Sequence, residues 1–179
     1  MKKILITALA GLLLAACADK AQEYRIHGRV TSNELEDVQV FLVPLGHEEP
    51  WNVDSVRIHN HEFFFKGKEH WICEIRLDKY NRDKGQNLLV ATEPGDIFVT
   101  IGPDSSGGGT PQNDSLQVWK GLTIQYNRTD NVLRGEGRME ELAAEREAYK
   151  ARTRAMALSL GEDSIVGAFL LGLYPLPKE

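Results

Sequence analysis

The sequence predicts an α+β fold, a small antiparallel β-sandwich or partly open barrel followed by a C-terminal helical hairpin or subdomain. Residues 23–104 contain short apolar runs with a period of two between polar turns, which is typical of such β-structures. After residue 110 the apolar spacing changes to three and four, which is the period of helices. Before residue 23 stands a separate apolar segment, whose composition is typical of an export signal.

That N-terminal segment reads KKILITALAGLLLAACADK from residue 2. Two lysines precede an apolar run over residues 4–14, which is shorter than the roughly 20 residues that span a bilayer. The run ends in Leu14-Ala15-Ala16-Cys17, which resembles a bacterial lipobox. We therefore predict a lipoprotein signal peptide over residues 1–16 and a tether over residues 17–22, with Cys17 acylated. The alternative is an ordinary signal peptide with an incidental cysteine.

Composition agrees with an anchored, single-domain envelope protein. Without residues 1–16, which contain two lysines, 19 basic residues stand against 26 acidic ones, a net charge of −7. Nucleic-acid binding depends on Lys and Arg, so we expect no nucleic-acid partner. If Cys17 carries lipid, Cys73 has no partner in the chain, and no internal disulfide is expected. The predicted location is the cell envelope, at the outer membrane, on a periplasmic or surface face that the sequence leaves open.

The β-rich domain is expected over residues 23–104. Strand-like alternation occurs at residues 24–30, 38–43, 71–78, 88–91 and 97–101. In residues 71–78, Cys73 falls on the apolar face, which favours a buried, inert thiol over a reactive one. In the run Phe63-Phe64-Phe65, Phe63 and Phe65 share one face and Phe64 has the other; one face is core, and the other is either covered by the helices or exposed as an aromatic contact site.

A Gly/Ser-rich connection over residues 105–110 then leads to a helical subdomain over residues 111–179. Thr110-Pro111 can serve as N-cap and first helical residue of the first helix. A second helix is expected over residues 139–160, with acidic residues early and basic residues late. Asp163 or Ser164 would cap a last, apolar helix over residues 165–173, before Pro175.

Three runs in this order resemble a known family. VDSVRIHNHEFFFKG, residues 53–67, and GTPQND, residues 109–114, are followed by DSIVGAFLLGLYP, residues 163–175. Together with the lipobox they resemble the β-rich domain of unknown function that precedes thioredoxin-like disulfide oxidoreductase domains in Bacteroidetes lipoproteins. The residues that carry this resemblance are Asp54, Ser55, Phe63, Phe65, Gly67, Gly109, Thr110, Asn113 and Asp114.

The resemblance implies the fold and the compartment but no enzyme. The chain stops at Lys178-Glu179, where the oxidoreductase domain would begin, and the sequence contains no Cys-x-x-Cys. Thiol exchange of that type needs an attacking and a resolving thiol, so we expect a stand-alone accessory domain. His61 stands where the family favours Gly in a type I′ turn, which suggests a different turn.

Other candidate sites have weak signals. His59 and His61 could bind a metal, but Asn60-His61 is expected in a turn, which would disperse the ligands, so no metal or other cofactor is predicted. Ser105–Thr110 lacks the Gly-Lys-Ser/Thr ending of a phosphate cradle. Ser55, Ser115 and Ser164 each lie in an Asp-Ser-apolar sequence, which resembles the O-glycosylation sequon of Bacteroidetes envelope proteins, and modification would need an exposed site.

Two functions from different classes remain. The first is a non-catalytic, lipid-anchored module that binds a partner protein or a small envelope ligand. The second is the detached accessory subunit of a thiol-disulfide oxidoreductase, whose thioredoxin-like domain is on another chain. In the second, the apolar helix over residues 165–173 would be a docking surface, although it could equally be buried on its own sheet.

Overall fold

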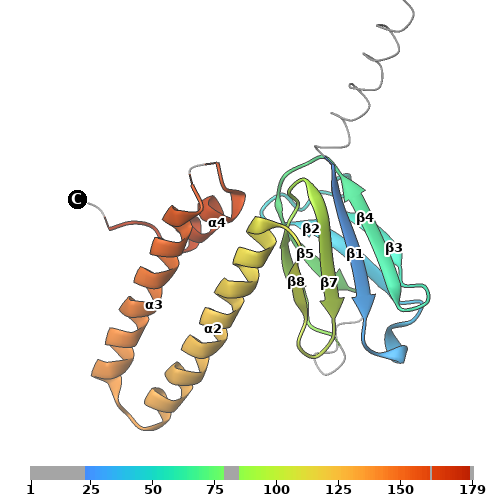
Figure 1. The fold of residues 1–179 in the computed structure, drawn as a ribbon. Helices are drawn as coiled ribbons and strands as arrows, with labels where there is room; N and C mark the ends of the chain where they lie inside the picture. The colour runs from blue at the N-terminus through green and yellow to red at the C-terminus, as the bar shows by residue number, and fades with distance from the viewer. Residues whose placement is uncertain (1–22, 79–84, 162, 178–179) are drawn as a thin grey trace, which may run out of the picture.

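The computed structural model describes residues 23–78, 85–161 and 163–177, which form two four-stranded sheets and three α-helices (Figure 1). Sheet A has the order β4 (Glu62–Gly67), β1 (Tyr24–Val30), β7 (Gly95–Ile101), β8 (Ser106–Gly108). Sheet B has the order β3 (Asp54–Arg57), β2 (Gln39–Pro44), β5 (Ile72–Leu77), β6 (Leu88–Ala91), and a 3-10 helix, η1 (Asn33–Leu35), follows β1. The predicted α+β class is confirmed, as an open sandwich and not a barrel. The predicted signal peptide, Cys17 and tether lie outside the described residues.

The core lies between the two sheets and follows from the alternation in the strands. In β1 and β5 every second residue is buried, and Ile26, Ile75 and Ile97 have almost no exposed surface. Each fully buried aliphatic side chain stabilises the folded state by about 1.5–3 kcal/mol. Cys73 lies in this core, as its position on the apolar face predicts.

The pairing of the strands differs from a simple antiparallel arrangement in two places. β1 pairs with β4 antiparallel but with β7 parallel. β3 and β4, which look like a hairpin in the sequence, belong to different sheets, because the chain crosses from sheet B to sheet A over residues 58–61. Ile58 is fully buried at this crossing.

The turn at the crossing is a type I′ turn, so the expectation of a different turn is wrong. Asn60 and His61 both have positive φ, 53° and 63°, and His59 and Glu62 exchange both backbone hydrogen bonds. The Glu36 carboxylate accepts from the amides of Asn60, at 2.7 Å, and His61, at 3.0 Å. These two bonds compensate the cost of a left-handed conformation at His61.

The segment expected as a Gly/Ser-rich connection, residues 105–110, contains strand β8. Ser106–Gly108 pairs with β7, with Phe98 opposite Gly108. Glycine weakens a strand, so this one forms because the backbone of β7 offers unpaired groups at the sheet edge.

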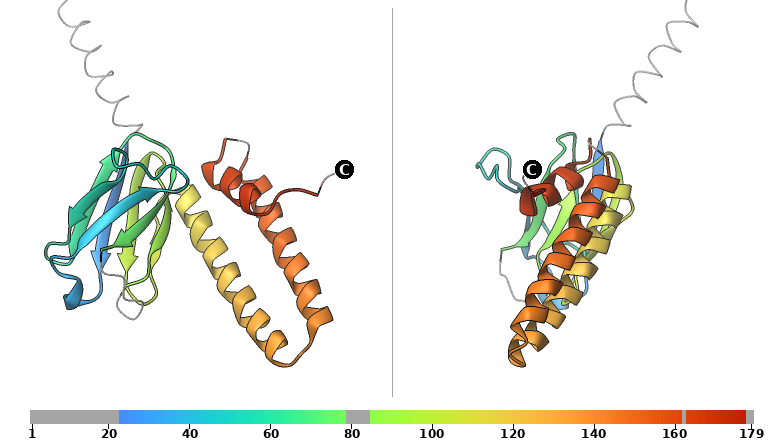
Figure 2. Two further views of the ribbon diagram at one scale, coloured as in Figure 1. Left: turned by 180° about the vertical axis from the view of Figure 1, so that it is seen from behind. Right: turned by 90° about the vertical axis from the view of Figure 1, so that its left-hand side faces the viewer.

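The helices are α2 (Pro111–Gly135), α3 (Met139–Ser159) and α4 (Ile165–Leu173). α2 and α3 form the predicted hairpin, which projects away from the sandwich. α4 packs across the upper end of this hairpin (Figure 2). The Ser164 hydroxyl accepts from the Gly167 amide, so the predicted N-cap of α4 is confirmed. None of the described helices is both long and apolar enough to span a membrane.

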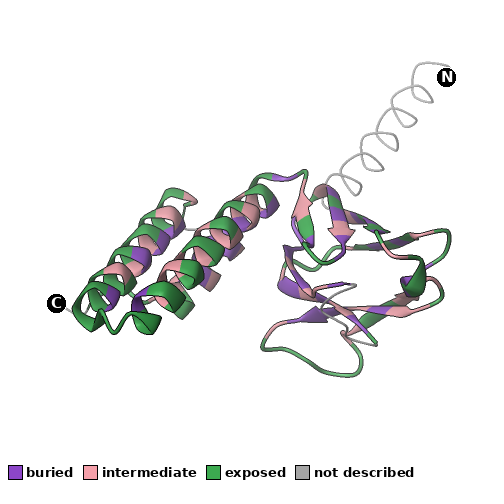
Figure 3. Ribbon diagram, turned by 90° about the horizontal axis from the view of Figure 1, so that it is seen from below, coloured by how far each residue is buried: buried purple, intermediate pink, exposed green. Residues whose placement is uncertain are grey.

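A second apolar cluster joins these helices to the outer face of sheet B. Ile72 and Ala91 of that face pack with Leu116 of α2 and with Val166 and Leu170 of α4. Beyond this contact the hairpin has little cover, and exposed residues occupy most of its surface (Figure 3). The helices therefore contact sheet B and, through α2, the edge strand β8 of sheet A, and they leave the outer face of β4, β1 and β7 open.

Candidate functional site

Three aromatic side chains lie side by side on the outer face of sheet A. In the register of the sheet His27 of β1 stands between Phe64 of β4 and Phe98 of β7. Both ring-centroid distances from His27 are 5.2 Å. Phe64 is 43% exposed and Phe98 58%. We call these three residues the aromatic row.

The strand alternation explains why these rings point outward. In β4, Phe63 and Phe65 enter the core, so Phe64 must point to the opposite face. Of the two possibilities that the sequence left open for Phe64, the structure shows the exposed one, because no helix covers this part of sheet A; a role as a contact site stays a prediction. Isolated exposed apolar residues are ordinary, but a contiguous apolar group on an uncovered face is typical of a binding surface.

Polar side chains flank the aromatic row. On one side Arg25 donates two hydrogen bonds to Asp96, both 2.8 Å long, and His27 Nε2 lies 2.9 Å from Asp96 Oδ1. The Arg25 guanidinium and the His27 ring hold the pKa of Asp96 well below its usual range. On the other side, Arg29 and its cross-strand neighbours Glu62 and Thr100 border a shallow hollow that the aromatic row also lines. An apolar centre with a polar rim is the usual composition of a protein interface.

The geometry of the rings favours a protein partner over a sugar. The His27 and Phe98 planes differ by 20° and stack against each other, while Phe64 is tilted by 60° to His27. Rings that stack on one another do not present one continuous flat face to a sugar ring. They form an uneven apolar surface, against which the side chains of another protein can pack.

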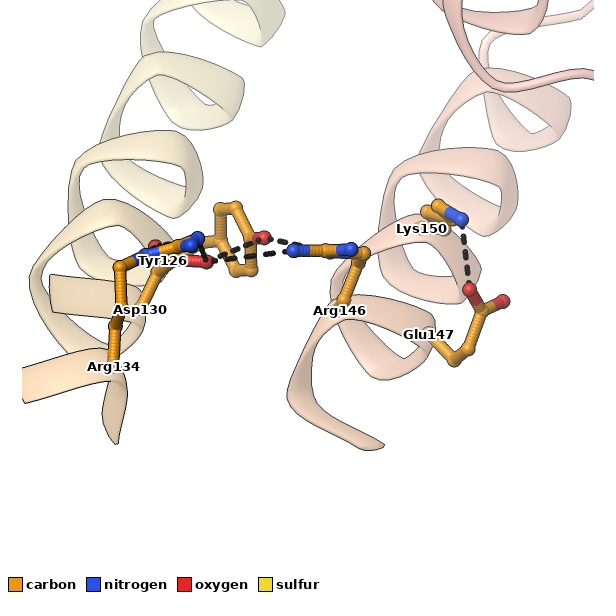
Figure 4. Close-up of polar contacts among 6 residues, drawn as sticks. All are labelled: Tyr126, Asp130, Arg134, Arg146, Glu147 and Lys150. Atoms are coloured by element: carbon orange, nitrogen blue, oxygen red, sulfur yellow. Dashed lines mark hydrogen bonds and ion pairs between the residues drawn. The ribbon is translucent and has the colours of Figure 1, made fainter. Parts of the chain in front are cut away.

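Polar groups on the hairpin hold its two helices together (Figure 4). Asp130 accepts from Arg134, at 2.9 Å, and from the Tyr126 hydroxyl, at 3.2 Å, and Arg146 of α3 lies 3.9 Å from the same carboxylate. Arg134 holds the pKa of Asp130 below its usual value. The Tyr126 ring stacks on Tyr149, with centroids 4.5 Å apart. These groups are used within the hairpin, so we assign them a structural role.

The residues of the GTPQND run join the helices to the sandwich. The Asn113 side chain donates to the Ala91 carbonyl, at 2.8 Å, and accepts from the Ala91 amide, at 3.0 Å. Asp114 accepts from the amide of Gly109, which has a φ of 97°. Thr110 occupies the N-cap position but makes no capping bond with its side chain. The run therefore has a structural role, because its hydrogen bonds connect α2 to the sandwich.

The cap of α2 is supplied by Glu93, which the sequence reasoning missed. The Glu93 carboxylate accepts from the amides of Gln112, at 2.7 Å, and Asn113, at 3.2 Å. A carboxylate at this helix end also complements the helix dipole. Nothing local in the sequence indicates this partner, because Glu93 lies in the loop between β6 and β7.

The remaining residues that carry the resemblance also have structural roles. Asp54 accepts from the Ser55 amide at the start of β3, and Phe63 and Phe65 fill the core. A Cβ added at Gly67 would overlap the Tyr24 side chain. Gly67 is therefore needed for the close approach of β1 and β4.

The two histidines proposed as weak metal candidates are not brought together as ligands. Possible ligand atoms of Glu36, Asp37 and His59 lie within 4.8 Å of one another, and His61 does not belong to this group. The Glu36 carboxylate already accepts from two turn amides, which also lower its pKa. Hydrogen bonding within the turn accounts for this cluster.

The three serines of the possible glycosylation sequences differ in exposure. Ser55 is exposed on the edge strand β3, and Ser115 is half-buried with its hydroxyl bonded to the Pro111 carbonyl. Ser164 is buried and caps α4. Ser55 alone of the three is exposed as modification requires, and its glycosylation stays a prediction.

The comparisons with known proteins identify the β-rich part of the chain. The family model described as domain of unknown function DUF4369 matches residues 24–116, which cover the sandwich and the first turns of α2. No curated protein and no solved structure matches the chain. The match extends over more than half of the sequence, and the chain therefore belongs to the DUF4369 family of domains of unknown function.

Proposed function

We propose that this protein is a non-catalytic, lipid-anchored module of the cell envelope that binds a partner protein through the outer face of sheet A. The observation that carries the proposal is the aromatic row, Phe64, His27 and Phe98, exposed on a face that the helices leave open. Exposed aromatic side chains at the centre of a surface, with charged groups at its rim, are where binding energy concentrates in protein interfaces.

The rigidity of the face supports this role. β1 is the central strand of the aromatic row, paired on both sides along its length. The Arg25–Asp96 pair and the His27–Asp96 contact hold the row at one end. A rigid surface loses little conformational entropy on binding, which favours affinity.

The lipid anchor rests on the sequence Leu14-Ala15-Ala16-Cys17. Acyl chains attached through the Cys17 sulfur would hold the sandwich at a membrane, since each buried methylene contributes about 0.8 kcal/mol. The acidic mature chain, with a net charge of −7, fits an envelope protein that acts on proteins and not on nucleic acid.

The alternative of an oxidoreductase accessory subunit has less support from the geometry. It would use the apolar helix α4 for docking, but Val166, Gly167 and Leu170 of α4 are buried, and Val166 and Leu170 pack with the protein's own helices and sheet B. Cys73, the free thiol of the described residues, is buried, and burial raises its pKa to about 12.

The test is a comparison of two surface variants in affinity capture. The mature chain carrying Cys17→Ser is used as bait in detergent-treated envelope extract, with and without Phe64→Ser and Phe98→Ser together. Val118→Ser, on a residue of α2 that is 60% exposed, is the matched control. Loss of an interface aromatic costs more than about 1–2 kcal/mol, so the double variant should bind at least roughly tenfold more weakly.

The outcome is decided by which variant changes recovery. A partner that is recovered by the wild type and the Val118 variant, and lost by the double variant, supports the proposal. Equal recovery by all three baits would show that sheet A is not the contact surface. Thermal unfolding of each bait checks that the sandwich is intact.

A further inference from the structure

We propose that the end of the sandwich where β1 begins rests on the lipid surface, and that Trp51 is its contact with the membrane interface. The inference rests on the proposed acylation of Cys17. It adds which surface of the protein faces the lipid and which residue enters it.

The length of the tether limits how far this end can lie from the membrane. From Cys17 to Glu23 there are six residue steps, which span at most about 20 Å when fully extended. β1 has seven residues and is about 23 Å long. The tether therefore keeps the Tyr24 end within about 20 Å of the anchored residue, a distance no greater than the length of β1 itself.

Trp51 lies at this end and is unusually exposed. It lines the same hollow as Tyr24, the first residue of β1, together with Trp71 and Lys66. At 81% it is the most exposed large apolar side chain of the described residues. The N-terminus of β1 and the loop before β3 both lie at the upper end of the molecule in Figures 1 and 2.

The local sequence holds Trp51 outward. The Asn52 amide donates to the Glu49 carbonyl at 3.0 Å, which closes a turn with Pro50 at its second position and Trp51 at its third. The Asn52 side chain accepts from the Glu49 amide, at 3.0 Å, and donates to the His47 carbonyl. A turn fixed by three bonds presents the indole at its corner and not against the sandwich.

The chemistry of this end suits the interfacial zone of a bilayer. Tryptophan prefers this zone because its ring is apolar and its N–H can still find a polar partner. Charges around the hollow are mixed, since Lys66 stands with Asp54 and Glu69. Contact should therefore depend on the indole and not on attraction to anionic lipids.

This orientation leaves the aromatic row free for a partner. His27 is three residues along β1 from Tyr24, which corresponds to about 10 Å of strand. With the Tyr24 end on the lipid, the outer face of sheet A stands away from the headgroups. The two proposed surfaces can then be occupied together.

The experiment uses the full lipidated protein in vesicles of neutral phosphatidylcholine that contain brominated chains, which quench nearby tryptophan fluorescence. Mass spectrometry first establishes whether Cys17 is acylated. We expect the brominated chains to quench the tryptophan fluorescence of the wild type, and we expect this quenching to be lost in Trp51→Phe. The extent of quenching should not change when anionic lipid or salt is added. The control is Trp51→Phe with Val132→Trp, which moves an exposed indole to the far end of α2, at a position 55% exposed in the wild type, and should not be quenched.

The outcomes separate the two proposals. If Cys17 is not acylated, the anchoring in the proposed function fails, and this inference fails with it. If Cys17 is acylated but Trp51→Phe is quenched as strongly as the wild type, or neither is quenched, the anchor stands and the inference is overturned. Quenching of the Val132→Trp control as strong as that of the wild type would also overturn it.

Discussion

Gly28 controls the packing behind the aromatic row, and its replacement by alanine tests the register of sheet A. Gly28 faces the core opposite Phe63 in the β1–β4 ladder. A Cβ added there would overlap the Phe63 ring, which is itself buried. The ring must then move against its neighbours, which costs about 1–3 kcal/mol in a packed core. Glycine in a strand interior is itself unfavourable by about 0.5–1 kcal/mol, and alanine recovers this.

The expected net destabilisation of Gly28→Ala is therefore about 1–2 kcal/mol, which lowers Tm by roughly 2–8 °C for a chain of this size. Urea unfolding and thermal melting of the mature chain with Cys17→Ser measure both. Gly121→Ala is the control, because Gly121 is exposed in α2 and an added Cβ would meet nothing within 4 Å beyond the adjacent backbone of its own helix, and it should stabilise by about 0.5–1 kcal/mol.

The assigned cause of the destabilisation is overlap between the new methyl group and the Phe63 ring. It is tested by adding Phe63→Leu, which makes room for that methyl group. The double variant should be more stable than the sum of the two single effects predicts, with a coupling of about 0.5–3 kcal/mol. A Gly28→Ala protein as stable as wild type, or strict additivity with Phe63→Leu, would refute the assigned packing.

Three further predictions concern the turn and the buried thiol. Hydrogen bonds from the turn amides lower the pKa of Glu36 below its ordinary value of 4.5, so its stabilisation is complete above about pH 4.5 and is lost as the pH falls through the lowered pKa. In urea titrations at several pH values Glu36→Gln should be less stable than wild type at pH 7, and the difference should vanish in acid; a constant difference would contradict this. His61→Gly should raise Tm, because glycine adopts a positive φ without the steric cost that histidine has there. After the entropy cost of glycine is subtracted, the free energy of unfolding should rise by about 0.5–1 kcal/mol, and a lower Tm would contradict this. In the Cys17→Ser protein, burial raises the pKa of Cys73 to about 12, so iodoacetamide at pH 8 should alkylate it much more slowly when folded than in urea, and equal rates by mass spectrometry would disprove its burial.

Local patterns predicted the elements of this fold better than their partners. The alternation in residues 24–30 and 71–78 and the cap at Ser164 are each confirmed, because they depend on near neighbours in the chain. The parallel pairing of β1 with β7 and the separation of β3 from β4 were not predicted, because they depend on contacts distant in sequence.

Only part of the candidate site could be predicted, because local patterns do not show which elements pack on one another. Alternation in β4 places Phe64 outside, but whether helices cover it depends on where α2 and α4 pack. Phe98 was not singled out, although its outward position in β7 follows from the same period. Glu93 caps α2 from a remote loop, and no local signal could have identified it.

The most direct test of the proposed contact surface is site-specific photocrosslinking in intact envelopes. The photoreactive analogue p-benzoylphenylalanine replaces Phe64 in one protein, and Leu158, an exposed residue of α3, in another. We predict one discrete adduct from position 64, which Phe98→Ser abolishes, and no corresponding adduct from position 158. The same adduct from both positions, or none from position 64, would contradict a binding function for sheet A.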